Sequence, residues 1–344
     1  MGRAATFLRN AWYMAAWSHE IGEILFRRRL LGEPMLLFRK QDGTVAAMVD
    51  RCPHRFAPLS LGTRDGDTVT CPYHGLSFNA AGECVRNPFS AALPKGTQVP
   101  AFHVAERDGI VWFWAGERER ADESTIPDFS MLYVEGHGAP ITGLMPMRAD
   151  FEYGTDNLMD LSHIEFVHKG SFAGRGVIFA GEHSVLEEGD TLRSNWWMPD
   201  VPAPSHTFGI YDPEMRCDHW LEMRWDAPAS MHLEIGGCPH GAERAGGVIV
   251  HQAHILTPET ADTSHYFWAT TRTMPPSEEG DAMLFGLMSQ AFNEEDKPII
   301  EAAFANMDGA DFWDRKPAFL GIDAGGTRAR RVLQKLIQKE SAPS

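Results

Sequence analysis

Two short segments near the N-terminus carry residue types that can bind a metal cluster. Cys52 and His54 lie in a Cys-Pro-His-Arg segment, Cys71 and His74 lie in a Cys-Pro-Tyr-His-Gly segment, and 16 residues (55–70) separate the two. Each segment supplies one thiolate and one imidazole. Two thiolates on one iron and two imidazoles on the other form the ligand set of a Rieske [2Fe–2S] centre. The repeated Cys-Pro step therefore predicts two similar loops around one cluster.

The same four side chains would also satisfy the tetrahedral coordination of zinc. Zinc-binding sequences usually place Cys beside Cys and His beside His, whereas Cys and His are interleaved here. We therefore favour the iron–sulfur cluster. A zinc-binding structural module is the alternative, and it would be colourless.

Residues 156–168 contain a second group with metal-binding potential. His163 and His168 are five residues apart, and five helical steps rotate by about 140° net, so they cannot share one face of a regular helix. They can converge on one metal if the helix loosens near Ser162. With a carboxylate from elsewhere they would form a two-His-one-carboxylate triad, which leaves positions on non-haem Fe(II) open for O₂.

Two polar residues just before these histidines are candidates for catalytic support. Asp160 lies three residues before His163, where its carboxylate could accept a hydrogen bond from an imidazole and fix its tautomer. Asn157 lies one helical turn before Asp160, so both side chains could face the metal. Asn157 would then orient a water or act as a weak ligand, although a capping role is equally compatible with the sequence.

Both motifs together make the chain resemble the oxygenase component of a Rieske non-haem iron oxygenase. It is most similar to the group of aromatic O-demethylases that includes vanillate demethylase and dicamba monooxygenase. The segments that carry this narrower resemblance are 7–13, 156–161 and 254–260. The resemblance implies a third iron ligand in a C-terminal helix, which we assign to Asp296. Glu294 and Glu295 are competing carboxylates that spacing alone does not exclude.

The resemblance also implies an activity and partners. A [2Fe–2S] cluster would pass electrons to a mononuclear Fe(II), which would use O₂ to O-demethylate a methoxylated aromatic acid. By this resemblance, the electrons would come from NAD(P)H through a separate flavin reductase or ferredoxin. The chain lacks a Gly-x-Gly-x-x-Gly loop after a strand, so it is not expected to bind the nucleotide itself. A homotrimer is expected. The alternatives are another oxidation (cis-dihydroxylation, N-demethylation or arylsulfonate methyl hydroxylation) and an electron carrier that has lost its iron site.

Length and composition limit the remaining possibilities. A chain of 344 residues suggests two domains, and the charged segment 117–124 places a Rieske domain in 1–120 and a catalytic domain in 121–344. The net charge of −16 argues against nucleic-acid binding. No apolar run approaches the roughly 20 residues of a membrane span, and no signal peptide is recognisable, so we expect a cytoplasmic protein.

The hydrophobic pattern predicts an α+β fold. The first domain reads as short strands with tight turns, for example around Asp42-Gly43 and Asp108-Gly109. In the second, a helix is expected over 150–161 and another helical region over 279–307, interrupted at Pro298. Strands are expected between them, and a last helix at 328–339. The resemblance implies a helix-grip arrangement, in which helices cover one antiparallel sheet. The expected strands cover 191–197, 219–225, 231–235, 248–256 and 264–271.

One of these strands is the candidate substrate wall. Alternation along residues 248–256 puts Gln252 and His254 on one face and His251 on the other. Gln252 and His254 could orient a substrate carboxylate in an apolar pocket. On neighbouring strands, His232 and Trp268 are candidates for a polar contact or an aromatic wall. Arg272 is a competing anchor at a strand end.

Overall fold

The computed structural model describes residues 7–93, 95–172 and 176–341. The chain forms two compact units, one of Thr6–Ile126 and one that includes Pro127–Ser344. The division follows the charged segment 117–124 and falls a few residues after the boundary expected at 120. In the described part, no helix is long and apolar enough to cross a membrane.

The N-terminal unit is built from two antiparallel sheets. Six strands form the larger one in the order β1-β10-β9-β4-β3-β2, and four form the smaller one in the order β5-β6-β7-β8. Asp108 and Gly109 both have positive φ (54° and 71°), as a tight hairpin turn between β9 and β10 requires. The strands are β1 Trp12–Trp17, β2 Phe26–Leu30, β3 Glu33–Arg39, β4 Val45–Val49, β5 Thr63–Asp65, β6 Thr68–Thr70, β7 Ser77–Phe78, β8 Cys84–Arg86, β9 Ala101–Arg107 and β10 Ile110–Trp114.

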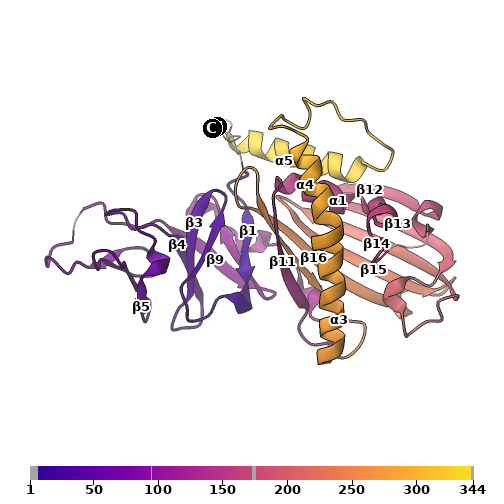
Figure 1. Cartoon of the computed structure of the whole chain (residues 1–344), viewed down its shortest axis with the longest axis horizontal. Helices are drawn as coiled ribbons and strands as arrows, with labels where there is room; N and C mark the ends of the chain where they lie inside the picture. Colours follow the sequence, from indigo (N-terminus) through magenta and orange to yellow (C-terminus); the bar gives the residue numbers. More distant parts are fainter. Residues whose placement is uncertain (1–6, 94, 173–175, 342–344) are drawn as a thin grey trace. The chain divides into compact units, whose positions relative to one another are not determined.

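The C-terminal unit is organised around one seven-stranded antiparallel sheet (Figure 1). Its order is β11-β17-β16-β15-β14-β13-β12, so six consecutive strands form a meander and β11 closes one edge beside β17. The sheet and its helices confirm the expected α+β fold. The strands are β11 Ile141–Met147, β12 Glu182–Glu188, β13 Thr191–Pro202, β14 Arg216–Asp226, β15 Ser230–Pro239, β16 Val248–Pro258 and β17 Ser264–Thr270.

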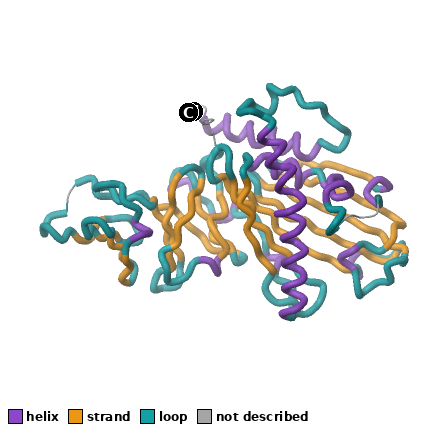
Figure 2. Tube along the Cα trace, in the orientation of Figure 1, coloured by secondary structure: helices purple, strands orange, loops and turns teal. Residues whose placement is uncertain are grey.

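The helices lie on one face of this sheet (Figure 2). Helix α1 spans Phe151–Met159 and contains the first residues of the metal-binding segment 156–168. The carboxylate of its N-cap residue, Asp150, accepts a hydrogen bond from the backbone N–H of Glu152. Here α1 ends before Ser162, and a 3₁₀ turn leads into α2, Ile164–Val167. Farther along, α3 (Glu278–Ser289) continues through a π-helix, Gln290–Asp296, into α4 (Lys297–Ala305). Pro298 lies in the first turn of α4, as its missing N–H favours, and α5 is Ala324–Ser341.

The register of the sheet decides which side chains face the helices. His254 pairs with Met231 on one side and with Trp268 on the other, and Trp268 pairs with Gly143. Because paired residues of antiparallel strands point to the same face, these side chains form one row. The Trp268 ring contacts Phe285 of α3, so this row belongs to the helix-covered face, which we call the inner face.

Candidate cluster and iron sites

The two cluster loops have the same backbone geometry. The N–H of Cys52 donates to the carbonyl of Ala57 (2.9 Å) and that of Cys71 donates to Leu76 (2.8 Å). Four residues after each Cys, the N–H of Phe56 or Gly75 donates back to the Cys carbonyl. These two residues also share a left-handed backbone, with φ of 61° and 72°. The repeated sequence therefore folds into two equivalent turns.

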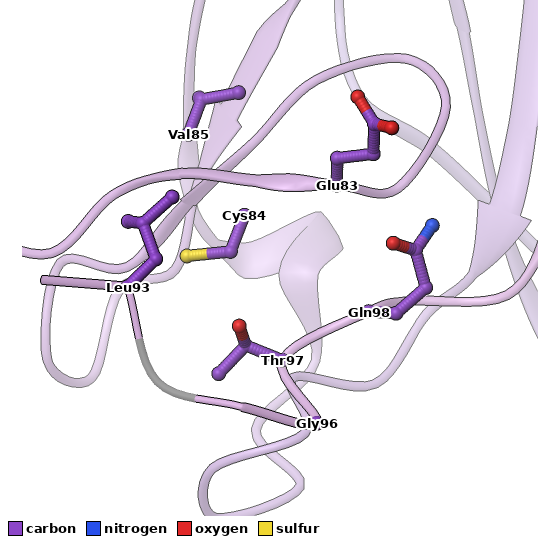
Figure 3. Close-up of a pocket in the computed structure, with 7 residues that line it drawn as sticks. All are labelled: Glu83, Cys84, Val85, Leu93, Gly96, Thr97 and Gln98. Carbon is purple, nitrogen blue, oxygen red and sulfur yellow. The ribbon is translucent and has the colours of Figure 1, made fainter.

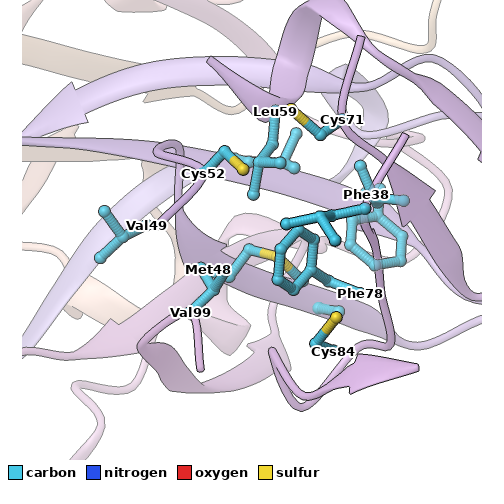
Figure 4. Close-up of a cluster of buried hydrophobic side chains, with 13 residues drawn as sticks. Phe38, Met48, Val49, Cys52, Leu59, Cys71, Phe78, Cys84 and Val99 are labelled. Atoms are coloured by element: carbon cyan, nitrogen blue, oxygen red, sulfur yellow. The ribbon is translucent and has the colours of Figure 1, made fainter. Parts of the chain in front are cut away.

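The side chains of these loops fit a two-iron cluster. Cys52 and Cys71 are buried in an apolar cluster with Leu59 and Phe78 (Figure 4), and no disulfide joins them. Burial raises the pKa of the Cys52 thiol, while N–H groups of His54 and Arg55 at its sulfur lower it. Backbone donors of this kind stabilise cluster sulfurs and tune their potential.

The two histidines of the loops lie beside each other. The rings of His54 and His74 have centroids 4.5 Å apart. Nδ1 of His74 is buried without a hydrogen-bond partner within the described residues. A buried polar atom normally has a partner, and a metal would satisfy this one. The two imidazoles lie side by side and the two thiols interact with each other, which fits the two ligand pairs of a Rieske cluster.

In the C-terminal unit, a second convergence brings together His163, His168 and Asp296. One candidate ligand atom from each lies within 4.8 Å of the other two. Nε2 of His163 is 3.5 Å from Oδ1 of Asp296, and Nε2 of His168 is 3.4 Å from Oδ2. The carboxylate is 2% exposed. This is the geometry of a two-His-one-carboxylate triad, which would hold a non-haem iron.

Glu295 fixes the orientation of one of these imidazoles. Its Oε2 accepts hydrogen bonds from Nδ1 of His168 (2.8 Å) and from the hydroxyl of Ser171 (2.5 Å). Gln290 donates to the other carboxylate oxygen at 3.2 Å. Because Nδ1 is bonded to Glu295, Nε2 of His168 is the ring nitrogen left to bind a metal. The sequence identified Glu295 only as a competing ligand, whereas the structure gives it this supporting contact.

Asp160 also supports an imidazole, but through a different atom from the one expected. Nδ1 of His163 contacts the backbone carbonyl of Asp160 at 2.5 Å. The Asp160 carboxylate instead accepts from the N–H of Ser162 and caps the 3₁₀ turn. The expected carboxylate–imidazole contact is therefore replaced by a main-chain contact, because the chain turns back on itself after α1.

Asn157 is brought to the same site. Its side-chain amide donates to Oδ1 of Asp296 at 3.2 Å, so it contacts the carboxylate rather than capping a helix. Asp296 is the last residue of the π-helix. A π-helix shifts the register of the residues that follow it and is frequently found at functional sites. This local change turns Asp296 inward and leaves Glu294 exposed.

An aromatic and polar wall adjoins the triad. Phe292, four residues before Asp296, contacts the rings of His254, Tyr266 and Trp268, with centroids 5.4–5.7 Å apart. Nδ1 of His254 is 2.6 Å from the Tyr266 hydroxyl, and its Nε2 is 3.2 Å from Oε1 of Gln252. Of the sequence candidates, Gln252, His254 and Trp268 therefore lie together on the inner face.

His232 lies on the opposite face of the sheet. It pairs with Ala253 and Arg224 in the sheet register, and its Nε2 is 3.1 Å from Nδ1 of His251. Odd and even positions of a strand point to opposite faces, so His232 and His254 cannot line the same site. Which face His232 shares with β16 depends on the register between the two strands, and counting along one strand does not give that register.

A surface pocket lies in the N-terminal unit (Figure 3). Its volume is about 510 Å³. Cys84 lies in it, with Sγ 3.6 Å from the carbonyl of Arg86. It contains none of the cluster or triad residues. It is lined by Glu83, Cys84, Val85, Leu93, Gly96, Thr97 and Gln98.

Comparison with known proteins agrees with this geometry. Residues 11–102 match the Rieske [2Fe-2S] domain, and residues 147–339 match the vanillate O-demethylase oxygenase C-terminal domain. The chain is a Rieske non-haem iron oxygenase. A [2Fe–2S] cluster and a mononuclear non-haem iron are the cofactors of this oxygenase.

Full-length relatives of the oxygenase act on different substrates. The oxygenase component of chloroacetanilide N-alkylformylase from Rhizorhabdus wittichii is 37% identical, with 98% of this chain and 97% of the relative covered. The oxygenase component of dicamba O-demethylase from Stenotrophomonas maltophilia is 34% identical, with 98% and 100% covered. The crystal structure of dicamba monooxygenase bound to 3,6-dichlorosalicylic acid has a TM-score of 0.92 and 33% identity, and covers 98% of this chain and 100% of that one. Both relatives are named as oxygenase components, that is, as parts of multicomponent systems.

Proposed function

We propose that the oxygenase removes a methyl group from an aromatic ether by oxidation. The observation that supports this most directly is the triad of His163, His168 and Asp296 beside an aromatic wall. Similarity to a dicamba O-demethylase along the whole chain points the same way. When bound, the iron supplies activation of O₂, so that one oxygen atom enters the C–H bond next to the ether oxygen.

The reaction balances with two electrons and two protons. The methyl ether becomes a hemiacetal and the second oxygen atom leaves as water. The hemiacetal C–O bond then breaks, giving a phenol and formaldehyde. The protein's share is positional: Glu295 and the Asp160 carbonyl hold the two imidazoles, and Asn157 holds the carboxylate. The aromatic rings around Phe292 exclude water and place the methyl group.

N-dealkylation of an anilide is the second candidate. It is favoured by the 37% identity to chloroacetanilide N-alkylformylase. The chemistry differs only in the heteroatom: oxidation of the carbon bound to nitrogen gives a carbinolamine, which loses an aldehyde. Both reactions need the same triad.

The electrons would reach the cluster from a flavin reductase or a ferredoxin that draws on NAD(P)H. We also propose a homotrimer in which the cluster of one chain serves the iron of its neighbour. A head-to-tail ring of this kind closes by three-fold rotation.

A turnover screen tests the proposal. The oxygenase, loaded with both cofactors and supplied with a surrogate reductase, is incubated with aromatic methyl ethers and N-alkyl anilides. Formaldehyde or another aldehyde should form in a one-to-one ratio with the phenol or with the N-dealkylated anilide. Ring diols or benzylic alcohols without aldehyde would overturn dealkylation and indicate another oxidation on the same scaffold.

A further inference from the structure

We infer that the buried carboxylate of Asp50 lowers the reduction potential of the [2Fe–2S] cluster, and that the Arg27 guanidinium offsets part of this effect. Neither residue is a cluster ligand. The effect acts on the cluster and not on the substrate, so it is independent of the proposed dealkylation. It follows from the burial of Asp50, its contacts and its place beside the first cluster loop.

Asp50 is a charged residue in an apolar part of the N-terminal unit. It is 2% exposed, and no other acidic or basic residue among the described part of this unit is as deeply buried. It directly follows Val49, whose side chain belongs to the same buried cluster as Cys52 and Cys71 (Figure 4). Water screens a charge in this setting less than it screens a charge at the surface.

The Asp50 carboxylate is held by Ser60 and Arg27. Its Oδ1 accepts a hydrogen bond from the N–H of Ser60 (2.7 Å), and its Oδ2 accepts one from the Ser60 hydroxyl (2.7 Å). Nε of Arg27 lies 2.8 Å from Oδ2, but the Arg27 side chain is 52% exposed. Because solvent screens the guanidinium more than the carboxylate, the pair acts on its surroundings as a net negative charge.

Asp50 and Ser60 lie at the two ends of the first cluster loop. Cys52 and His54 lie between them in the sequence, and Ser60 follows Leu59, which packs in the same buried cluster as Cys52. Two residues of chain span at most about 7 Å, so the Asp50 carboxylate lies on the order of 10 Å from a cluster bound to Cys52. The carboxylate is therefore close enough to act on the cluster electrostatically.

Reduction of the cluster adds one electron and therefore one negative charge. A fixed negative charge nearby disfavours this step and lowers the potential, whereas a positive charge favours it. At about 10 Å and an effective dielectric constant of about 20, one unit charge changes the ratio of reduced to oxidised cluster roughly tenfold at a fixed solution potential. A lower potential makes the reduced cluster a stronger electron donor to the iron.

Opposite shifts of the cluster potential in two variants test this role. The potential is measured at pH 8 by redox titration of the oxygenase loaded with both cofactors, with the visible absorbance of the cluster as the readout. Asp50→Asn removes the negative charge with little change of shape, and should raise the ratio of reduced to oxidised cluster about tenfold at a fixed potential. Arg27→Gln removes the cation and should lower this ratio. The double variant removes both charges, so its potential should lie between those of the single variants.

Two further variants separate charge from structure. Ser60→Ala removes a hydrogen bond to the same carboxylate but no charge, and should leave the potential unchanged. Glu33→Gln removes the carboxylate that pairs with Arg51, the residue before Cys52. Because this carboxylate is half-exposed, its loss should shift the potential much less than Asp50→Asn does.

Several outcomes would overturn the inference. Shifts of the same sign in Asp50→Asn and Arg27→Gln, or a shift in Ser60→Ala as large as that in Asp50→Asn, would show that loop structure rather than charge sets the potential. An equal shift in Glu33→Gln would show that burial of Asp50 gives it no special effect, and an unchanged potential in Asp50→Asn would show that it has none.

Retention of the cluster decides which variant carries the test. If Asp50→Asn does not hold the cluster, Arg27→Gln decides alone, because the half-exposed Arg27 side chain can be replaced without opening the core. A lowered potential in Arg27→Gln then supports the inference, and an unchanged or raised potential overturns it.

Discussion

Glu295 and Asp296 are neighbours in the sequence, but the structure gives them different tasks. Asp296 points at the Nε2 atoms of both histidines, whereas Glu295 accepts the Nδ1 proton of His168. Spacing did not distinguish these carboxylates because both sit in one helical turn. The hydrogen bond to His168 is the observation that separates an expected ligand from a residue that orients one.

Removal of the Glu295 charge should weaken iron binding without affecting the cluster. In Glu295→Gln, the imidazole loses a carboxylate partner, and such losses typically lower metal affinity about ten- to a hundredfold. Iron affinity is measured by titration of the protein depleted of mononuclear iron, with the visible absorbance of the cluster as the check on folding. Glu294→Gln is the matched control, because Glu294 is exposed. The same loss in both variants would contradict the role of Glu295.

Asp218 and His240 form a pair with a predictable pH dependence. Burial raises the pKa of Asp218. The hydrogen bonds from His240 and from the N–H groups of Gly241 and Asp200 together lower this pKa by more than burial raises it, so the net shift is downward. The hydrogen bond to Asp218 raises the pKa of His240. The Asp218 contribution is therefore lost as pH falls below about 4, and the His240 contribution is lost as pH rises above about 6.5.

The melting temperature of His240→Gln tests this pair. The difference from the natural protein should be largest near pH 5–6 and should shrink by pH 9, where His240 is deprotonated in both the folded and the unfolded chain. The same series with Asp218→Asn should show a deficit that shrinks only in part by pH 9, because the N–H groups of Gly241 and Asp200 still donate to the carboxylate, and that falls further in acid. A His240→Gln deficit that stays constant from pH 5 to pH 9 would show that the charge of His240 contributes nothing.

At the scale of elements, the sequence predicted the strands and helices with a regular hydrophobic pattern, but not the two edge strands of the sheet or the π-helix. Alternation located five strands of the sheet, and helical spacing located α1. The edge strands β11 and β12 were missed: β11 contains Gly143 and Pro146, which weaken strand propensity and are tolerated at an edge. The β12 strand is rich in exposed glutamates. The π-helix was missed because tertiary contacts, rather than residue propensities, hold its register.

Docking of α5 on α1 is an element-scale feature that supports the iron site. The Arg330 guanidinium binds Asp156 and Glu152 of α1 and packs over the Phe312 ring at 4.1 Å. Asp156 directly precedes Asn157, which contacts Asp296. A Cβ on Gly325 would lie 2.6 Å from the carbonyl of Met159 at the end of α1, so the two helices meet closely.

Arg330→Met should therefore lower both stability and iron occupancy. It leaves two half-buried carboxylates without their cation, which should cost about 3 kcal/mol. Urea unfolding followed by circular dichroism measures the first effect, and iron per chain after gel filtration measures the second. Lys335→Met, on the exposed side of the same helix, should change neither. Normal iron occupancy in a destabilised Arg330→Met protein would mean that α5 does not position the site.

At the scale of the whole molecule, the cluster loops and the triad belong to different units. Cys52 and His74 lie in Thr6–Ile126, and His163 and Asp296 lie in the unit that includes Pro127–Ser344. Electrons must therefore pass from one unit to another, either within a chain or between chains. A trimer that pairs the cluster of one chain with the iron of the next predicts that two different inactive chains can restore activity together.

Cys52→Ser removes a cluster ligand and Asp296→Ala removes an iron ligand, so each variant alone should be inactive. In randomly mixed trimers, half of the chains can donate electrons and half can accept them. In each mixed head-to-tail ring, about a third of the neighbouring pairs, one of the three, then joins an intact cluster to an intact iron site. Co-expression with two different affinity tags and tandem purification isolates the mixed assemblies, and formaldehyde release measures their turnover. Mixed trimers that remain inactive would show that electrons stay within one chain, because only a chain with both sites intact could then turn over.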